Sequence, residues 1–174
     1  VPMVGANSPY TLAGTMVQTN AEALGSLVLL QTLCPGIPTW YYVIMETMEM
    51  RQGSMQLFNP EVMLLLNGLY QMARTYQIPA VASALIGSNC QSQQIMFERG
   101  TSLLMTALAG VSEIGGVGGV GNGMMISPDL LAIDNEMIAF VKRYLEGFEI
   151  SADTLAVDVI HRVGHSGKFL EDIH

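Results

Sequence analysis

The stretch Val4-Gly5-Ala6-Asn7-Ser8-Pro9-Tyr10-Thr11-Leu12-Ala13-Gly14 sets the pattern that the rest of the chain repeats. A short apolar run stops at the polar residues Asn7 and Ser8. Pro9 follows with the fixed φ that suits a first helical position, and a long helical pattern then begins. The stretch therefore predicts a strand, a tight loop and the start of a helix. The same unit returns three more times, each time with a polar or glycine-rich loop between strand and helix.

Four βα units are expected from this pattern. Two helix starts are especially clear, because Asn59-Pro60-Glu61 and Ser127-Pro128-Asp129 each place a capping side chain before a proline and an acidic residue. The sequence predicts strands at 1–6, 39–45, 80–86 and 113–117, loops at 46–59 and 87–92, and helices at 11–33, 60–76, 93–108, 128–146 and 151–164.

Strands that alternate with helices through short connections predict an α/β fold with parallel strands. Residues 1–148 hold the four units, and residues 149–174 add a C-terminal helix and tail to the same domain. Both a doubly wound sheet and about half of a (βα)8 TIM-type barrel fit the pattern, because a whole barrel needs ~250 residues. Periodicity alone does not choose between them.

Composition narrows the classes of function. The chain has 174 residues, of which 50% are hydrophobic and 13% charged, which is enough for one domain with an ordinary core. Its net charge is −8 and its seven Lys and Arg are scattered, so we expect no nucleic-acid partner. The uncharged run Ala23–Met45 is interrupted by prolines, so we expect no membrane span. Cys34 and Cys90 lack metal or disulfide spacing, which favours a reducing cytoplasm.

Several separate motifs resemble the C-terminal half of the trimethylamine methyltransferase family, in the right order and nearly from end to end. They are Gly5 to Gly14 of the opening stretch, Asn20-Ala21-Glu22-Ala23-Leu24, Pro35-Gly36-Ile37-Pro38, Met50-Arg51-Gln52-Gly53, Asn59-Pro60-Glu61 and Gly167-Lys168-Phe169-Leu170. The resemblance implies a (βα)8 barrel that moves a methyl group from a methylated amine to the cobalt of a corrinoid (cobalamin) carried by a partner protein. Some members of the family use pyrrolysine for trimethylamine, and others lack it and resemble glycine betaine methyltransferases. This chain contains no pyrrolysine, so a quaternary amine is the preferred substrate hypothesis.

The chemistry of such a transfer indicates which side chains to look for. Co(I) attacks a carbon of the ammonium ion and the amine leaves in its neutral form, so no general acid is needed. Carboxylates, amide oxygens and aromatic faces can hold the cation in line and balance its charge. The loops after the strands carry Asn7, Tyr10, Glu46 and Asn89, which we predict to bind the substrate. The alternative for each is a cap or a solvated loop residue.

A glycine run from Gly115 to Gly123 is the second candidate feature. Residues 116–121 match the dinucleotide pattern GxGxxG, but the next helix begins only near Pro128, so the last glycine does not open it. We predict instead that Gly115, Gly116, Gly118 and Gly119 leave room for the flat corrinoid. A degenerate, inactive site is the alternative explanation.

No directly bound metal is expected. His161 and His165 have helical i, i+4 spacing, but no third ligand accompanies them, so an exposed helix face is the simpler interpretation. The 13 Met residues are spread through the predicted core stripes, so we expect them to fill gaps in the core rather than to form a binding surface.

Two other functions remain open at this point: a non-catalytic fragment or assembly half, and a nucleotide-binding doubly wound domain. An open half-barrel would expose two strand edges and the apolar helix at 11–33. We therefore expect a homo-oligomer, or a complex with a missing N-terminal half.

Overall fold

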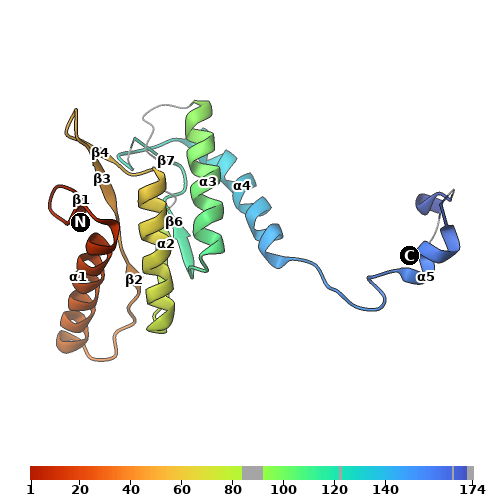
Figure 1. The fold of residues 1–174 in the computed structure, drawn as a ribbon, viewed down its shortest axis with the longest axis horizontal. Coiled ribbons are helices and arrows are strands. Elements are labelled where there is room, and N and C mark those ends of the chain that lie inside the picture. Colours follow the sequence, from red (N-terminus) through yellow and green to blue (C-terminus); the bar gives the residue numbers. More distant parts are fainter. Residues whose placement is uncertain (84–91, 122, 166, 172–174) are drawn as a thin grey trace.

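The computed structural model describes residues 1–83, 92–121, 123–165 and 167–171 (Figure 1). The helices are α1 (Leu12–Leu33), α2 (Pro60–Thr75), α3 (Gln93–Leu108), α4 (Pro128–Glu146) and α5 (Val157–Val163), with a 3-10 turn η1 (Phe169–Glu171). The strands are β1 (Met3–Val4), β2 (Tyr41–Tyr42), β3 (Glu46–Glu49), β4 (Ser54–Gln56), β5 (Ala80–Ser83), β6 (Glu113–Gly115), β7 (Gly119–Val120) and β8 (Met125–Ile126).

The principal strands pair in parallel and in chain order. β2 and β3 belong to one extended segment, 41–49, which pairs with β1 through β3 and with β5 through β2. β5 then pairs with β6, again in parallel. Continued by two residues, the register Met3↔Glu46 places Val1 beside Ile44, and the register Tyr42↔Val81 places Ser83 beside it. Two strands cannot occupy the same side of Ile44, so β1 and β5 lie on opposite edges of the segment. The strands thus form two three-stranded pieces, β1-β3-β4 and β2-β5-β6, which the segment 41–49 connects. The expected α/β fold with parallel strand pairs is confirmed.

The helices that follow these strands pack against one another in sequence. α1 contacts α2, α2 contacts α3, and α3 contacts α4. Figure 1 shows the four helices in this order across the molecule. A doubly wound sheet carries helices on both faces, whereas a barrel carries successive helices on one. The arrangement is compatible with part of a (βα)8 barrel. Its core lies between the helices and the sheet, where Tyr41, Met45, Leu65, Leu69 and Ala82 are fully buried.

Local capping explains where most helices begin. The Asn59 side chain accepts a hydrogen bond from the Val62 N–H at 2.9 Å, and the Ser127 hydroxyl accepts one from Leu130 at 3.4 Å, so both predicted caps are confirmed. The prediction that Pro9 occupies the first position of a helix is wrong. Thr11 caps α1 instead. Pro9 precedes the helix, and its carbonyl accepts a hydrogen bond from the Thr15 hydroxyl of α1.

Two segments predicted as loops contain β-hairpins. Residues 46–59 hold the antiparallel pair β3–β4, and the glycine run extends into the pair β7–β8. Sequence patterning missed the first because its strands are polar and only partly covered, and the second because glycine is depleted in strands. Strand 80–86 is described only to Ser83, and the loop that follows it lies outside the described residues up to Ser92.

The last helix is shorter than the sequence predicted. It begins at Val157 rather than at Ser151, because Ser151 and Thr154 bond to each other's main chain and close a separate turn. Figure 1 shows α5 and η1 at the far end of an extended link after α4, away from the sheet. The assignment of 149–174 to the same domain stays a prediction. No helix in the described part of the chain has the length and apolar character to cross a membrane.

Candidate functional site

The sheet has one face covered by helices and one that we call the open face. Tyr41 and Met45 point to the helices, since the Tyr41 hydroxyl donates to Asn20 Oδ1 of α1 at 3.0 Å and the Thr19 hydroxyl of α1 lies 3.2 Å from the sulfur of Met45. Successive side chains of a strand alternate between faces. The open face is therefore formed by Met3, Tyr42, Ile44, Glu46, Val81, Ser83, Glu113 and Gly115, which share it through the strand registers.

Polar groups on the open face occupy two levels along the strands. The hydroxyls of Tyr42 and Ser83, on neighbouring strands, are 3.2 Å apart. Glu46 is four residues beyond Tyr42, which is about 13 Å at ~3.3 Å per residue. The open face thus carries the hydroxyl pair and the Glu113 carboxylate at one level, and the Glu46 carboxylate nearer the carboxyl ends of the strands.

Glu46 does not stand at the end of a strand, as the sequence suggested. The strand continues to Glu49, and Glu46 pairs with Met3 of β1 inside the sheet. This position half-buries the side chain. Burial raises the pKa of Glu46. A carboxylate that is poorly solvated and lies on the open face is a suitable partner for an organic cation.

The side chain of Asn7 forms hydrogen bonds to the main chain of β1 and of the residues before it. Its Oδ1 accepts a hydrogen bond from the Met3 N–H at 2.6 Å, and its Nδ2 donates to the Val1 carbonyl at 3.1 Å. Since Met3 is the register partner of Glu46, Asn7 lies one strand away from that carboxylate. The amide of Asn7 is therefore engaged with the main chain, and its influence on the open face runs through β1.

Tyr10 and Asn89 are the other two predicted substrate residues. Tyr10 is 78% exposed, and its ring lies so close to Gly5 that an added Cβ there would be 3.2 Å from its Cδ2. Asn89 lies outside the described residues. The hydroxyl pair of Tyr42 and Ser83 was missed by sequence reasoning, although a serine in the apolar strand Ala80–Ser83 was a usable signal.

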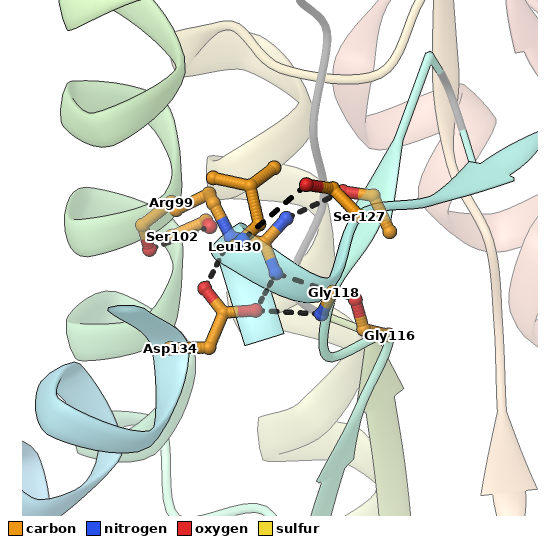
Figure 2. A network of polar contacts seen from close by, with 8 residues as sticks. Arg99, Ser102, Gly116, Gly118, Ser127, Leu130 and Asp134 are labelled. Atoms are coloured by element: carbon orange, nitrogen blue, oxygen red, sulfur yellow. Dashed lines mark hydrogen bonds and ion pairs between the residues drawn. The ribbon is translucent and has the colours of Figure 1, made fainter. Parts of the chain in front are cut away.

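The glycine turn, which we define as Gly116–Gly119, is held by a buried ion pair that lies beside it (Figure 2). Arg99 of α3 and Asp134 of α4 are 2% and 4% exposed, and their side chains form a two-pronged contact through Nε and Nη2 of the arginine. Asp134 Oδ2 accepts the Gly118 N–H at 2.6 Å. Arg99 donates to the carbonyls of Gly119 at 2.6 Å and Gly116 at 3.5 Å.

These bonds change what the glycine turn can offer a ligand. The Gly118 N–H already faces a carboxylate, which would repel a phosphate rather than help bind it. Gly116 and Gly118 have φ of 84° and 74°, a left-handed conformation that glycine adopts without strain. The turn is therefore a fixed wall of main chain beside the sheet edge. Binding of a corrinoid by Gly115, Gly116, Gly118 and Gly119 stays a prediction.

Sequence reasoning did not identify Arg99 and Asp134. A signal was present, because each interrupts an apolar helical stripe: Arg99 follows Ile95 by one turn, and Asp134 follows Leu130 by one turn. Within the residues that the structure describes, no group of three or more His, Cys, Asp or Glu could hold a metal ion.

Comparison with known proteins adds a family to this geometry. The model of the trimethylamine methyltransferase family matches residues 1–174. The chain is 36% identical to the trimethylamine methyltransferase of Methanosarcina thermophila, over 97% of this chain and 35% of that protein. It is 35% identical to the trimethylamine methyltransferase of Desulfitobacterium hafniense strain DCB-2, over 99% and 35%. It is 32% identical to a glycine betaine methyltransferase of D. hafniense strain Y51, over 99% and 36%. The chain thus spans about a third of the length of these relatives.

Proposed function

This chain belongs to the trimethylamine methyltransferase family, and we propose that it supplies four successive βα units of a (βα)8 barrel that transfers a methyl group from a quaternary amine to a corrinoid protein. The barrel is supported by the parallel strands in chain order and by the successive helix contacts. A barrel of eight units would need four more, from another segment or another chain. Its substrate site would lie on the open face, which a barrel turns inward.

The half-buried carboxylate of Glu46 carries the proposal. A quaternary ammonium ion has no N–H to donate, so it is recognised by charge and by contact with aromatic faces. Glu46 supplies the charge, and Tyr42, four residues earlier on the same segment, offers the face of its ring while its hydroxyl is paired with Ser83. These groups fit the amine, while the corrinoid would arrive on its own carrier protein. Reduced cobalt in that corrinoid supplies the nucleophile that accepts the methyl group.

The residues of this chain have three tasks in the reaction. They hold the cation with one methyl group facing the acceptor, they exclude water, and they balance the positive charge until it disappears. The C–N bond breaks with its electron pair left on nitrogen, so the product amine leaves neutral and no proton moves. A carboxylate that is poorly solvated before binding gains most from a bound cation, because little water must be removed from it.

The test is a methyl-transfer assay on the full protein with cob(I)alamin, which changes its absorption on methylation. Glycine betaine and trimethylamine are the methyl donors to compare. Glu46→Gln should lower kcat/KM roughly tenfold to a hundredfold, since a charge-assisted contact in a dry site is worth about 1.5–3 kcal/mol. Glu136→Gln, an exposed change of equal charge on α4, is the matched control. Equal kcat/KM for the native protein and Glu46→Gln would remove Glu46 from the site.

A second candidate is a non-catalytic assembly half, favoured by the span of about a third of the relatives' length. Exposed apolar residues on α1, among them Val17, Val28 and Leu33, support association with a second copy or another segment. Sedimentation across a dilution series should show a complex, and a monomer at all concentrations would count against the half-barrel. Failure of methyl transfer in a protein that assembles would favour the assembly function.

A further inference from the structure

We infer that Arg99 and Asp134 are positioning residues, which lock the glycine turn beside the carboxyl end of β6 and thereby fix one wall of the site. The catalytic part of this inference rests on the proposed function. The locking itself does not, because it concerns only contacts within this chain.

The energetics of the pair indicate a role beyond stability. Burying two charges removes both from water, and replacing a buried ion pair with apolar side chains of similar size is often neutral or stabilising. What an apolar pair cannot do is bond to the main chain. Arg99 and Asp134 together hold the carbonyls of Gly116 and Gly119 and the N–H of Gly118. The two side chains thus form hydrogen bonds to three main-chain groups of the turn.

The position of the turn links these hydrogen bonds to the sheet edge. It follows β6 directly, and the last residue of β6, Gly115, is the register partner of Ser83 on the open face. Beyond the turn, the Ser127 N–H donates to the Gly118 carbonyl at 2.9 Å and closes the β7–β8 hairpin. Ser127 also caps α4, the helix that carries Asp134. A rotation of the turn would therefore move the end of β6 and the hairpin together.

Loosening such a wall should affect the transfer step more than amine binding. The predicted amine contacts at Glu46 and Tyr42 are on other strands, so KM for the amine should stay unchanged. The alignment of donor and acceptor depends on the walls around them, and small misplacements cost much of the rate. Asp134→Asn should therefore lower kcat by about tenfold or more, with KM unchanged.

Hydrogen exchange of the full chain tests the locking without any activity assay. The double variant Arg99→Met plus Asp134→Leu keeps the space filled and removes both charges. In this variant the Gly118 amide hydrogen should exchange at least about tenfold faster than in the native chain, while the core amides of α2 should exchange at the native rate. Glu136→Gln is the control and should match the native chain throughout.

The outcomes separate the locking of the glycine turn from its effect on methyl transfer. Faster exchange confined to the turn, with a fall in kcat alone, supports the inference. Native exchange at Gly118 in the double variant overturns the locking, and so does an equal rise in exchange at the turn and in α2. Native kcat in a variant with a loosened turn overturns the catalytic part. Absence of methyl transfer in the unmodified protein overturns the proposed function, and the exchange result still decides the locking.

Discussion

Asp134→Ala should be among the most destabilising single substitutions in this chain. It leaves the Arg99 guanidinium 2% exposed with its carboxylate partner removed, and it leaves the Gly118 N–H without its acceptor. Breaking a buried ion pair by removing one partner costs about 3–5 kcal/mol. The lost Gly118 contact is part of the same network, so its ~1–3 kcal/mol is not simply added. We expect a loss of about 4 kcal/mol in the free energy of unfolding.

Thermal and urea denaturation followed by circular dichroism will measure this loss. For a chain of this size, each kcal/mol lowers Tm by about 2–4 °C, so the expected fall is about 8–16 °C. Asp129→Ala, in the exposed first turn of the same helix, is the matched control and should cost less than about 1 kcal/mol. The double variant Arg99→Met plus Asp134→Leu should recover the part of this loss that comes from the unpaired guanidinium, because it leaves no buried charge, while the Gly118 N–H stays without its acceptor. A loss below about 1 kcal/mol in Asp134→Ala, or no recovery in the double variant, would refute the account of a buried, mutually dependent pair.

Three further predictions follow from single contacts. Because burial raises the pKa of Glu46 above its usual 4.5, the folded chain binds more protons than the unfolded chain just above that pH, and stability falls as pH rises through this window. Glu46→Gln should abolish that fall in urea titrations, and an unchanged pH profile would contradict the burial of the carboxylate. Asn59→Ala removes the cap on the Val62 N–H and should cost about 1 kcal/mol, measured by the same titration, whereas no loss would mean the cap is replaced by water. Gly118→Ala places a Cβ at a φ of 74° and should destabilise by about 1–2 kcal/mol, while Gly100→Ala, in an open helical position, should stabilise by about 0.5–1 kcal/mol. Equal effects of the two glycine changes on Tm would disprove the constraint on the turn.

The sequence by itself determined the features of this protein that depend on neighbours in the chain. The caps at Asn59 and Ser127 bind N–H groups three residues ahead, so their pattern was visible in the sequence. The alternation of apolar strands with helical stripes likewise predicted a parallel α/β fold, which the β1–β3, β2–β5 and β5–β6 pairs confirm. Glu46 was recognisable as a candidate because it follows an apolar strand, although its place inside the strand was not.

Only the tertiary structure decided which distant residues meet. Arg99 and Asp134 are 35 residues apart, and Tyr42 and Ser83 are 41 apart, so no local pattern pairs them. The strand registers placed Glu46 and Tyr42 on the open face. The contacts between α3 and α4 brought the two buried charges together next to the glycine turn. Local propensity acts over a few residues, whereas the burial of charge and the pairing of strands are settled only when segments far apart in the chain pack together.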